Sequence, residues 1–215
     1  MRLALAKDAF PYVGAGAILT GVSALAGWPS TAWSLGLLTA FVAFFFRDPD
    51  RVLPREPDAV LAPADGRVVD VRTEEDGGTR ISIFLSVFNV HINRSPVLGR
   101  VAATEYRAGR FLAAFRREAS AENEQNMIRI LPEDPSGGQR GEVTVRQIAG
   151  AIARRIVCWT NAGDALRAGE RLGLIKFGSR VDLHLPPGAR PTVSVGDRVH
   201  GGSDIVARWE KAGEP

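Results

Sequence analysis

The stretch LGLIKFGSRVDLHLP, residues 172–186, contains two apolar runs separated by the pair Gly178–Ser179. In the second run, VDLHL at 181–185, apolar residues alternate with polar ones, and this period of two is typical of a half-buried strand. A glycine followed by a serine between two such runs is, taken alone, a turn or a bulge. The stretch therefore predicts two β-strands that meet at Gly178–Ser179.

Short β-rich runs of the same kind make up most of the chain beyond Arg51, with glycine, proline and aspartate turn signals between them. One convincing helical stretch extends from Arg110 to about Asn123, and a second, short one is expected over 162–168. This pattern predicts that residues 51–215 form a β-dominated α+β domain, a compact β barrel or sandwich with one or two helices.

Two apolar runs without any charge precede this domain, at about 11–27 and 31–46. As a helix, each run of roughly 16 residues spans about 24 Å, slightly less than the bilayer core of about 30 Å. Positive residues lie only outside the pair, which places both ends on the cytoplasmic side. They are Arg2, Lys7, Arg47 and Arg51. Residues 1–50 are therefore expected to form an apolar helical hairpin that dips into or barely crosses the cell membrane from its cytoplasmic face. A buried hairpin of a soluble protein is the alternative.

Composition excludes several other classes of function. The chain has 215 residues and a formal net charge of +3, and its arginines are mixed with acidic residues, so no nucleic-acid partner is expected. A single Cys158 excludes an internal disulfide. The three histidines are far apart in the sequence and no cysteine pair accompanies them, so no metal site is expected.

Four polar positions stand out within the β-rich part. Asp65 precedes Gly66, His91 follows an apolar strand, the segment ENEQN lies at 122–126, and Ser179 ends the glycine–serine pair. Each has an ordinary structural interpretation: an aspartate before glycine is usually a turn residue, and a histidine at a strand end is usually a hydrogen-bonded structural residue.

Taken together in their order, these positions belong to seven motifs that resemble the short bacterial form of the phosphatidylserine decarboxylase family. The resemblance extends from about Phe44 to the C-terminus and includes the apolar segment before it. The motifs are FFRDPDR, APADGRVVDV, SVFNVHINRSPVLGRV, ENEQN, GAIARRIV, ERLGLIKFGSRVDLHLP and VGDRVHGG.

The resemblance implies a self-cleaving enzyme. The chain would cut itself between Gly178 and Ser179 into a β chain of residues 1–178 and an α chain of 179–215, which stay together as a heterodimer. Ser179 would become a pyruvoyl group, the covalent cofactor that forms a Schiff base with the amine of a membrane phospholipid. His91 is implied as the base that activates the Ser179 hydroxyl, and Asp65 as the carboxylate that orients the imidazole.

Elementary chemistry agrees with this implication. Loss of CO₂ from an amino acid leaves a carbanion, so the enzyme must supply an electron sink, which is usually pyridoxal phosphate held by a lysine. The chain has only three scattered lysines and no glycine-rich phosphate loop. A ketone made from the protein backbone meets the same need. Gly178 suits the cut because it has no side chain to hinder attack on its carbonyl.

The chain departs from longer members of the family at a histidine position, and three alternatives stay open. Longer relatives have two histidines where FNVHINRSP has one, and alignment on Pro96 places Arg94 at the second position. His91 would then serve both self-cleavage and turnover, or Arg94 would share the work. The alternatives are a decarboxylase of a related serine phospholipid, a membrane-anchored lipoyl or biotinyl carrier module, and a membrane-anchored hydrolase. A higher homo-oligomer is also open, since strand edges can pair.

Overall fold

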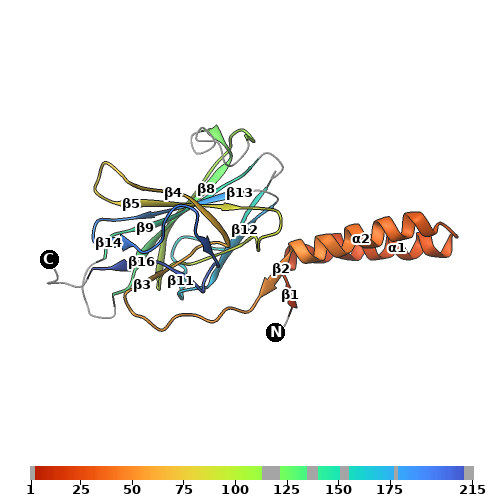
Figure 1. Cartoon of the computed structure of the whole chain (residues 1–215), viewed down its shortest axis with the longest axis horizontal. Coiled ribbons are helices and arrows are strands. Elements are labelled where there is room, and N and C mark those ends of the chain that lie inside the picture. The colour runs from red at the N-terminus through yellow and green to blue at the C-terminus, as the bar shows by residue number, and fades with distance from the viewer. Residues whose placement is uncertain (1–2, 113–121, 135–139, 151–154, 177–178, 211–215) are drawn as a thin grey trace. The chain divides into compact units, whose positions relative to one another are not determined.

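The computed structural model describes residues 3–112, 122–134, 140–150, 155–176 and 179–210. The chain divides into two compact units, Met1–Asp50 and Arg51–Pro215. We describe each unit by itself (Figure 1).

The first unit is built around two helices that pack side by side (Figure 1). Gly27, with φ of +74°, follows α1 in the left-handed conformation that commonly ends a helix, and Pro29 begins α2, where its missing amide proton is not needed. No helix among the described residues is both long and apolar enough to span a bilayer. The elements are β1 (Leu3–Leu5), the 3-10 helix η1 (Lys7–Ala9), α1 (Phe10–Leu25), α2 (Pro29–Phe45) and β2 (Arg47–Pro49), with β1 antiparallel to β2.

The second unit consists of strands in its described part, and together with the helices α1 and α2 these strands confirm the prediction of a β-dominated α+β protein. Its strands are β3 (Ala59–Leu61), β4 (Gly66–Thr73), β5 (Thr79–Leu85), β6 (Ile92–Arg94), β7 (Gly99–Arg107), β8 (Gln125–Pro132), β9 (Val143–Ile148), β10 (Ile156–Cys158), β11 (Ala165–Leu166), β12 (Arg171–Ile175), β13 (Ser179–Leu185), β14 (Ala189–Pro191), β15 (Arg198–Val199) and β16 (Ile205–Trp209).

These strands form one curled eight-stranded sheet and two small ones (Figure 1). The large sheet has the order β11-β7-β8-β9-β13-β5-β4-β15, and the small sheets have the orders β10-β12-β6 and β14-β16-β3. Every neighbouring pair is antiparallel. β12 ends at Ile175 in a small sheet and β13 begins at Ser179 in the large one, in agreement with the two strands that the sequence predicted.

The core lies against the inner face of the curled sheet, because alternate residues of each strand point there. On β13, Val181 and Leu183 are fully buried on this face, and cross-strand Ile83 and Val145 meet them from β5 and β9. This period of two is the one that the sequence 181–185 predicted.

Two helices expected in this unit have different outcomes. The helix expected over 110–123 falls mostly on residues 113–121, outside the described residues. The prediction of a short helix over 162–168 is wrong. There, Ala165–Leu166 is the two-residue strand β11, paired with β7, and its ends are turns at Gly163 and Gly169, whose φ angles are +93° and +75°. These left-handed residues bracket the segment and leave no room for a helix.

The outer face of the sheet contains a buried ion pair. Arg180 donates from Nε and Nη2 to the two carboxylate oxygens of Asp182, over 2.6 and 2.8 Å. His184 follows on the same face and is largely covered. Burial lowers the pKa of His184 from its usual 6.5, and Arg146 and Arg80 lower it further, while Asp182 opposes them.

His184 is therefore expected to weaken the fold in acid. In the unfolded chain it takes up a proton as the pH falls through about 6.5, whereas the folded chain resists protonation until a lower pH, so stability falls with falling pH. Replacing His184 by glutamine should remove this loss. Thermal unfolding at pH 7.5 and 5, in a Ser179→Ala background that keeps the chain whole, measures it. Equal losses in both chains on acidification would contradict the expectation.

Candidate active site

Ser179 and Asp65 lie at the same end of the three neighbouring strands β4, β5 and β13. Ser179 is the first residue of β13 and is opposite Leu85, the last residue of β5. Asp65 immediately precedes β4, and Arg67 of β4 is opposite Phe84 of β5. Because β5 is antiparallel to both neighbours, its C-terminal end meets the N-terminal ends of β4 and β13. The register thus brings together two positions far apart in sequence.

His91 comes to the same region by the turn that follows β5. Its ring is almost completely buried, and Nδ1 lies 2.9 Å from the carbonyl oxygen of Asn89. A carbonyl can only accept, so Nδ1 bears the proton and Nε2 has the lone pair that a base needs. The carbonyl of His91 accepts from the amide of Ile175 over 3.4 Å, which fixes this residue beside the end of β12. His91 is therefore adjacent to the strand that leads to Ser179.

The Ser179 side chain is fully buried on the inner face of the sheet, and Oγ has no hydrogen-bond partner within the part of the chain that the structure describes. Burying a hydroxyl without a partner costs about 1–3 kcal/mol. A buried hydroxyl without a partner calls for an explanation, and a reacting group is one. Gly178, the other half of the predicted cleavage site, lies outside the described residues.

A chain of buried amides lines this end of the core. Asn126 of β8 donates to Oε1 of Gln147 over 3.0 Å, and Nε2 of Gln147 donates to Oδ1 of Asn93 over 2.8 Å. Gln147 is opposite Val181, two residues beyond Ser179 on the same face. The interior is thus apolar along most of the sheet and polar at the Ser179 end.

Asp65 has partners other than His91. Its carboxylate accepts from Nη2 of Arg51 over 2.7 and 2.8 Å and from the amide of Gly201 over 2.8 Å. Within the described residues Asp65 and His91 share no hydrogen bond. The next residue must be glycine, because a Cβ on Gly66 would lie 2.2 Å from the carbonyl oxygen of Phe84. Only glycine therefore allows β4 to begin next to β5.

Replacing Asp65 by asparagine should slow self-cleavage about tenfold or more if its carboxylate supports the base. The Arg51–Asp65 pair is mostly buried, with side-chain exposures of 12% and 8%, so breaking it should also cost up to about 3–5 kcal/mol of stability. Arg51→Gln is the matched control, because it breaks the same pair and keeps the carboxylate. Cleavage of both variants is followed by denaturing electrophoresis below their unfolding temperatures. Self-cleavage of Asp65→Asn at the wild-type rate would show that Asp65 has no part in the cleavage site.

Arg94 ties together three loops near this site. Its side chain is buried, Nη1 donates to the carbonyl of Gly169 over 3.1 Å, and its amide donates to the carbonyl of Pro63 over 2.8 Å. A Cβ at Gly202 would lie 2.9 Å from Cδ of Arg94, and Gly202 also has φ of +76°. Arg94 thus connects the loops that contain Pro63, Gly169 and Gly202.

The ENEQN segment has two kinds of role. Asn123 exchanges two hydrogen bonds of 2.8 Å with the backbone of Leu112 and donates to the carbonyl of Ala149 over 2.7 Å, which anchors the start of β8. Gln125 accepts from Nε of Arg146 on the outer face. Asn126 points inward and belongs to the amide chain described above.

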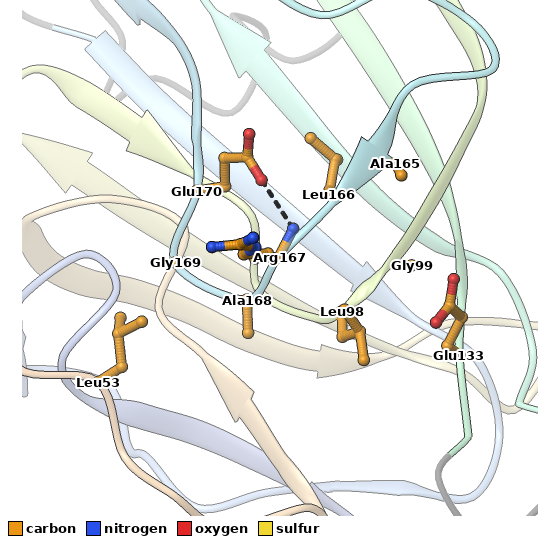
Figure 2. Close-up of a pocket in the computed structure, with 10 residues that line it drawn as sticks. All are labelled: Leu53, Leu98, Gly99, Glu133, Ala165, Leu166, Arg167, Ala168, Gly169 and Glu170. Atoms are coloured by element: carbon orange, nitrogen blue, oxygen red, sulfur yellow. Dashed lines mark hydrogen bonds between the residues drawn. The ribbon is translucent and has the colours of Figure 1, made fainter.

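A separate surface pocket of about 660 Å³ lies beside β11 and the start of β7 (Figure 2). Its apolar lining is formed by Leu53, Leu98, Ala165, Leu166 and Ala168. Figure 2 also shows the hydrogen bond from the amide of Arg167 to Glu170, 2.8 Å long. Ser179, His91 and Asp65 do not line this pocket. Within the described residues, no three histidine, cysteine, aspartate or glutamate side chains gather as a metal site requires.

Some residues of the site were not singled out from the sequence. Nothing in the sequence indicated that Arg51 pairs with Asp65 or that the Asn89 carbonyl contacts His91, because both contacts depend on the fold. Gln147 could have been recognised from the sequence. It follows Val143 and Val145 as the third inward-facing residue of an alternating strand, a position that an apolar residue usually occupies. Asn93 stood within the quoted motif without a role of its own.

Comparison with known proteins places the chain among the decarboxylases. The family model of phosphatidylserine decarboxylase matches residues 38–207, and the chain belongs to this family. It is 44% identical to the phosphatidylserine decarboxylase proenzyme of Burkholderia lata over 212 residues, which cover 96% of this chain and 97% of the relative. The proenzymes of Burkholderia vietnamiensis and Burkholderia ambifaria are 45% identical over the same length. The resemblance predicted from the seven motifs is confirmed.

Proposed function

We propose that this chain converts phosphatidylserine to phosphatidylethanolamine by loss of CO₂, after cutting itself between Gly178 and Ser179. The family membership supports the reaction. The observation that supports the cut is the buried, unpaired hydroxyl of Ser179 at the same end of the sheet as His91. The relatives named above are proenzymes, in agreement with a chain that is made in an inactive form.

Self-cleavage begins at Ser179. His91 Nε2 takes the hydroxyl proton as Oγ bonds to the carbonyl carbon of Gly178, and the peptide C–N bond then breaks as its nitrogen takes a proton. The ester that results breaks by β-elimination: a base takes the Cα proton of residue 179, a Cα=Cβ double bond forms, and the Cβ–O bond breaks to free the carboxylate of Gly178. The dehydroalanine left at position 179 takes up water and releases ammonia, so that the α chain begins with a pyruvoyl ketone.

The residues present fit such a group. Its ketone would supply the electron sink for the electrons released with CO₂. Position 179 is enclosed, and Ile175, fully buried next to His91, helps to exclude water. Once His91 Nε2 has taken up a proton, it can give that proton to the carbon from which CO₂ departs. Asp65 is the carboxylate of the proposed site, with its charge balanced by Arg51 in the uncut chain.

The first unit supports a lipid substrate. Leu25, Trp33 and Leu37 on α1 and α2 are 91%, 81% and 75% exposed, and a helix exposing so much apolar surface favours a lipid environment. We propose that α1 and α2 form a membrane-associated hairpin on the cytoplasmic face of the cell membrane. Recovery of the full-length protein in the soluble fraction without detergent would contradict this.

Incubation of the cut protein with phosphatidylserine labelled in the serine carboxyl group tests the reaction. Release of labelled CO₂ together with phosphatidylethanolamine is expected. A related serine phospholipid is the second candidate substrate, because the head group would react identically, and a parallel incubation with another lipid backbone separates the two. A cut protein that releases no CO₂ from either lipid would refute the proposed reaction.

A further inference from the structure

Within the described residues, Oγ of Ser179 and Nδ2 of Asn93 are buried at the Ser179 end of the core without a hydrogen-bond partner. Both side chains are fully buried. An unmade hydrogen bond inside a protein costs about 1–3 kcal/mol for each such group. Asn93 has no role in the proposed chemistry so far, so its orphan donor requires a separate explanation.

The orientation of the Asn93 amide is determined by its neighbours. Oδ1 of Asn93 accepts from Nε2 of Gln147, and Oε1 of Gln147 is occupied by the Nδ2 donor of Asn126. Since Gln147 presents a donor to Asn93, the Asn93 oxygen must face it. The NH₂ group of Asn93 therefore points away from Gln147 and has donor capacity to spare.

Strand pairing and a hydrogen bond connect Asn93 to β12 and to Gln147 of β9. Asn93 lies on β6, two residues after His91, and is opposite Gly173 of β12, the strand that leads to Ser179. Its contact Gln147 is opposite Val181 of β13, next but one to Ser179 on the inner face. Asn93 is thus linked to the strands on both sides of the cut.

We propose that the Asn93 amide donates a hydrogen bond to the oxygen that becomes negatively charged when Ser179 attacks the preceding carbonyl. This inference rests on the proposed self-cleavage and adds a residue to it. The acceptor exists only while the bond is rearranging, so the donor is unpaired in the uncut chain, as a preorganised donor is before reaction.

The electrons and the proton of this step move among Ser179, His91 and the reacting carbonyl. As Oγ of Ser179 bonds to the carbonyl carbon, the π electrons of the carbonyl move to its oxygen, and the hydroxyl proton passes to Nε2 of His91. Asn93 stabilises the negative oxygen and transfers no atom. When the C–N bond breaks, the electrons return to the carbonyl and the nitrogen takes a proton.

Replacing Asn93 by aspartate tests the donor with almost no change in size. Aspartate can still accept from Gln147, but its second oxygen repels the developing charge, so self-cleavage should slow by about 10²–10³-fold. When it is protonated, its O–H can donate. The ratio of the Asn93→Asp rate to the wild-type rate should therefore rise as the pH is lowered, which a merely structural role would not produce.

Gln147→Glu tests the same donor without altering Asn93. Glutamate accepts but does not donate, so the Asn93 amide turns over, and its oxygen replaces its NH₂ at the reacting bond. A comparable slowing is expected. Ser82→Ala is the matched control, because Ser82 is a fully buried serine with an unpaired hydroxyl on the opposite face of the same sheet. It should cleave at the wild-type rate.

Full-length chains made by cell-free synthesis are followed over time by denaturing electrophoresis, and thermal unfolding checks that each variant is folded. Folded Asn93→Asp or Gln147→Glu chains that cleave within about threefold of the wild-type rate would overturn the role of Asn93 and leave the proposed function standing. A wild-type chain that stays whole would instead overturn the proposed self-cleavage, and this inference with it.

Discussion

A Ser179→Ala chain is expected to stay whole, whereas the wild-type chain separates into fragments of residues 1–178 and 179–215. Alanine has no hydroxyl to attack the preceding carbonyl, so the loss of cleavage should be complete and should not recover with time or pH. Because Oγ of Ser179 makes no hydrogen bond within the described residues, its removal should not destabilise the fold and should relieve the cost of burying an unpaired hydroxyl. Denaturing electrophoresis and intact mass measure the outcome.

The mass of the smaller fragment makes the test sharper. In the wild type its N-terminus should be blocked, because a ketone replaces the amino group, and N-terminal sequencing should therefore fail. Ser82→Ala serves again as the control that removes a buried, unpaired hydroxyl without affecting the cut. A Ser179→Ala chain that still separates at the same bond would refute the mechanism.

A His91→Gln chain is expected to cleave about 10²–10⁴-fold more slowly than the wild type, which is the usual contribution of a general base. The tautomer explains why this histidine can act: the Asn89 carbonyl holds the proton on Nδ1, so Nε2 is the basic nitrogen. Glutamine keeps hydrogen-bonding capacity at this site but cannot take up a proton at neutral pH.

The control for His91 is His200→Gln. His200 is exposed and bonds to Asp204 over 2.9 Å, so its replacement should leave the cleavage rate unchanged. The time course of cleavage gives both rates, and thermal unfolding shows whether each variant is folded. If folded His91→Gln cleaves as fast as wild type, another group must be the base, and the chain offers few alternatives because it has only three histidines.

The sequence by itself determined the local structure around the cut and the family. Alternation over 181–185 predicted β13, and two uncharged apolar runs coincide with α1 and α2. Seven motifs in order identified the phosphatidylserine decarboxylase family, as the comparisons confirm. These features were predictable because strand periodicity, apolar runs and motif order are properties of neighbouring residues along the chain. The helix expected over 162–168 failed because pairing with β7 outweighed a weak local preference.

Only the tertiary structure decided which groups surround Ser179. The sequence suggested a hydrogen bond between Asp65 and His91, whereas the structure pairs Asp65 with Arg51 and Gly201, and His91 with the Asn89 carbonyl. Such contacts depend on the register of β4, β5 and β13 and on where the loops close, which no local pattern specifies. The pairing of strands distant in sequence also leaves the Ser179 hydroxyl buried without a partner, because the interior around it is closed to water.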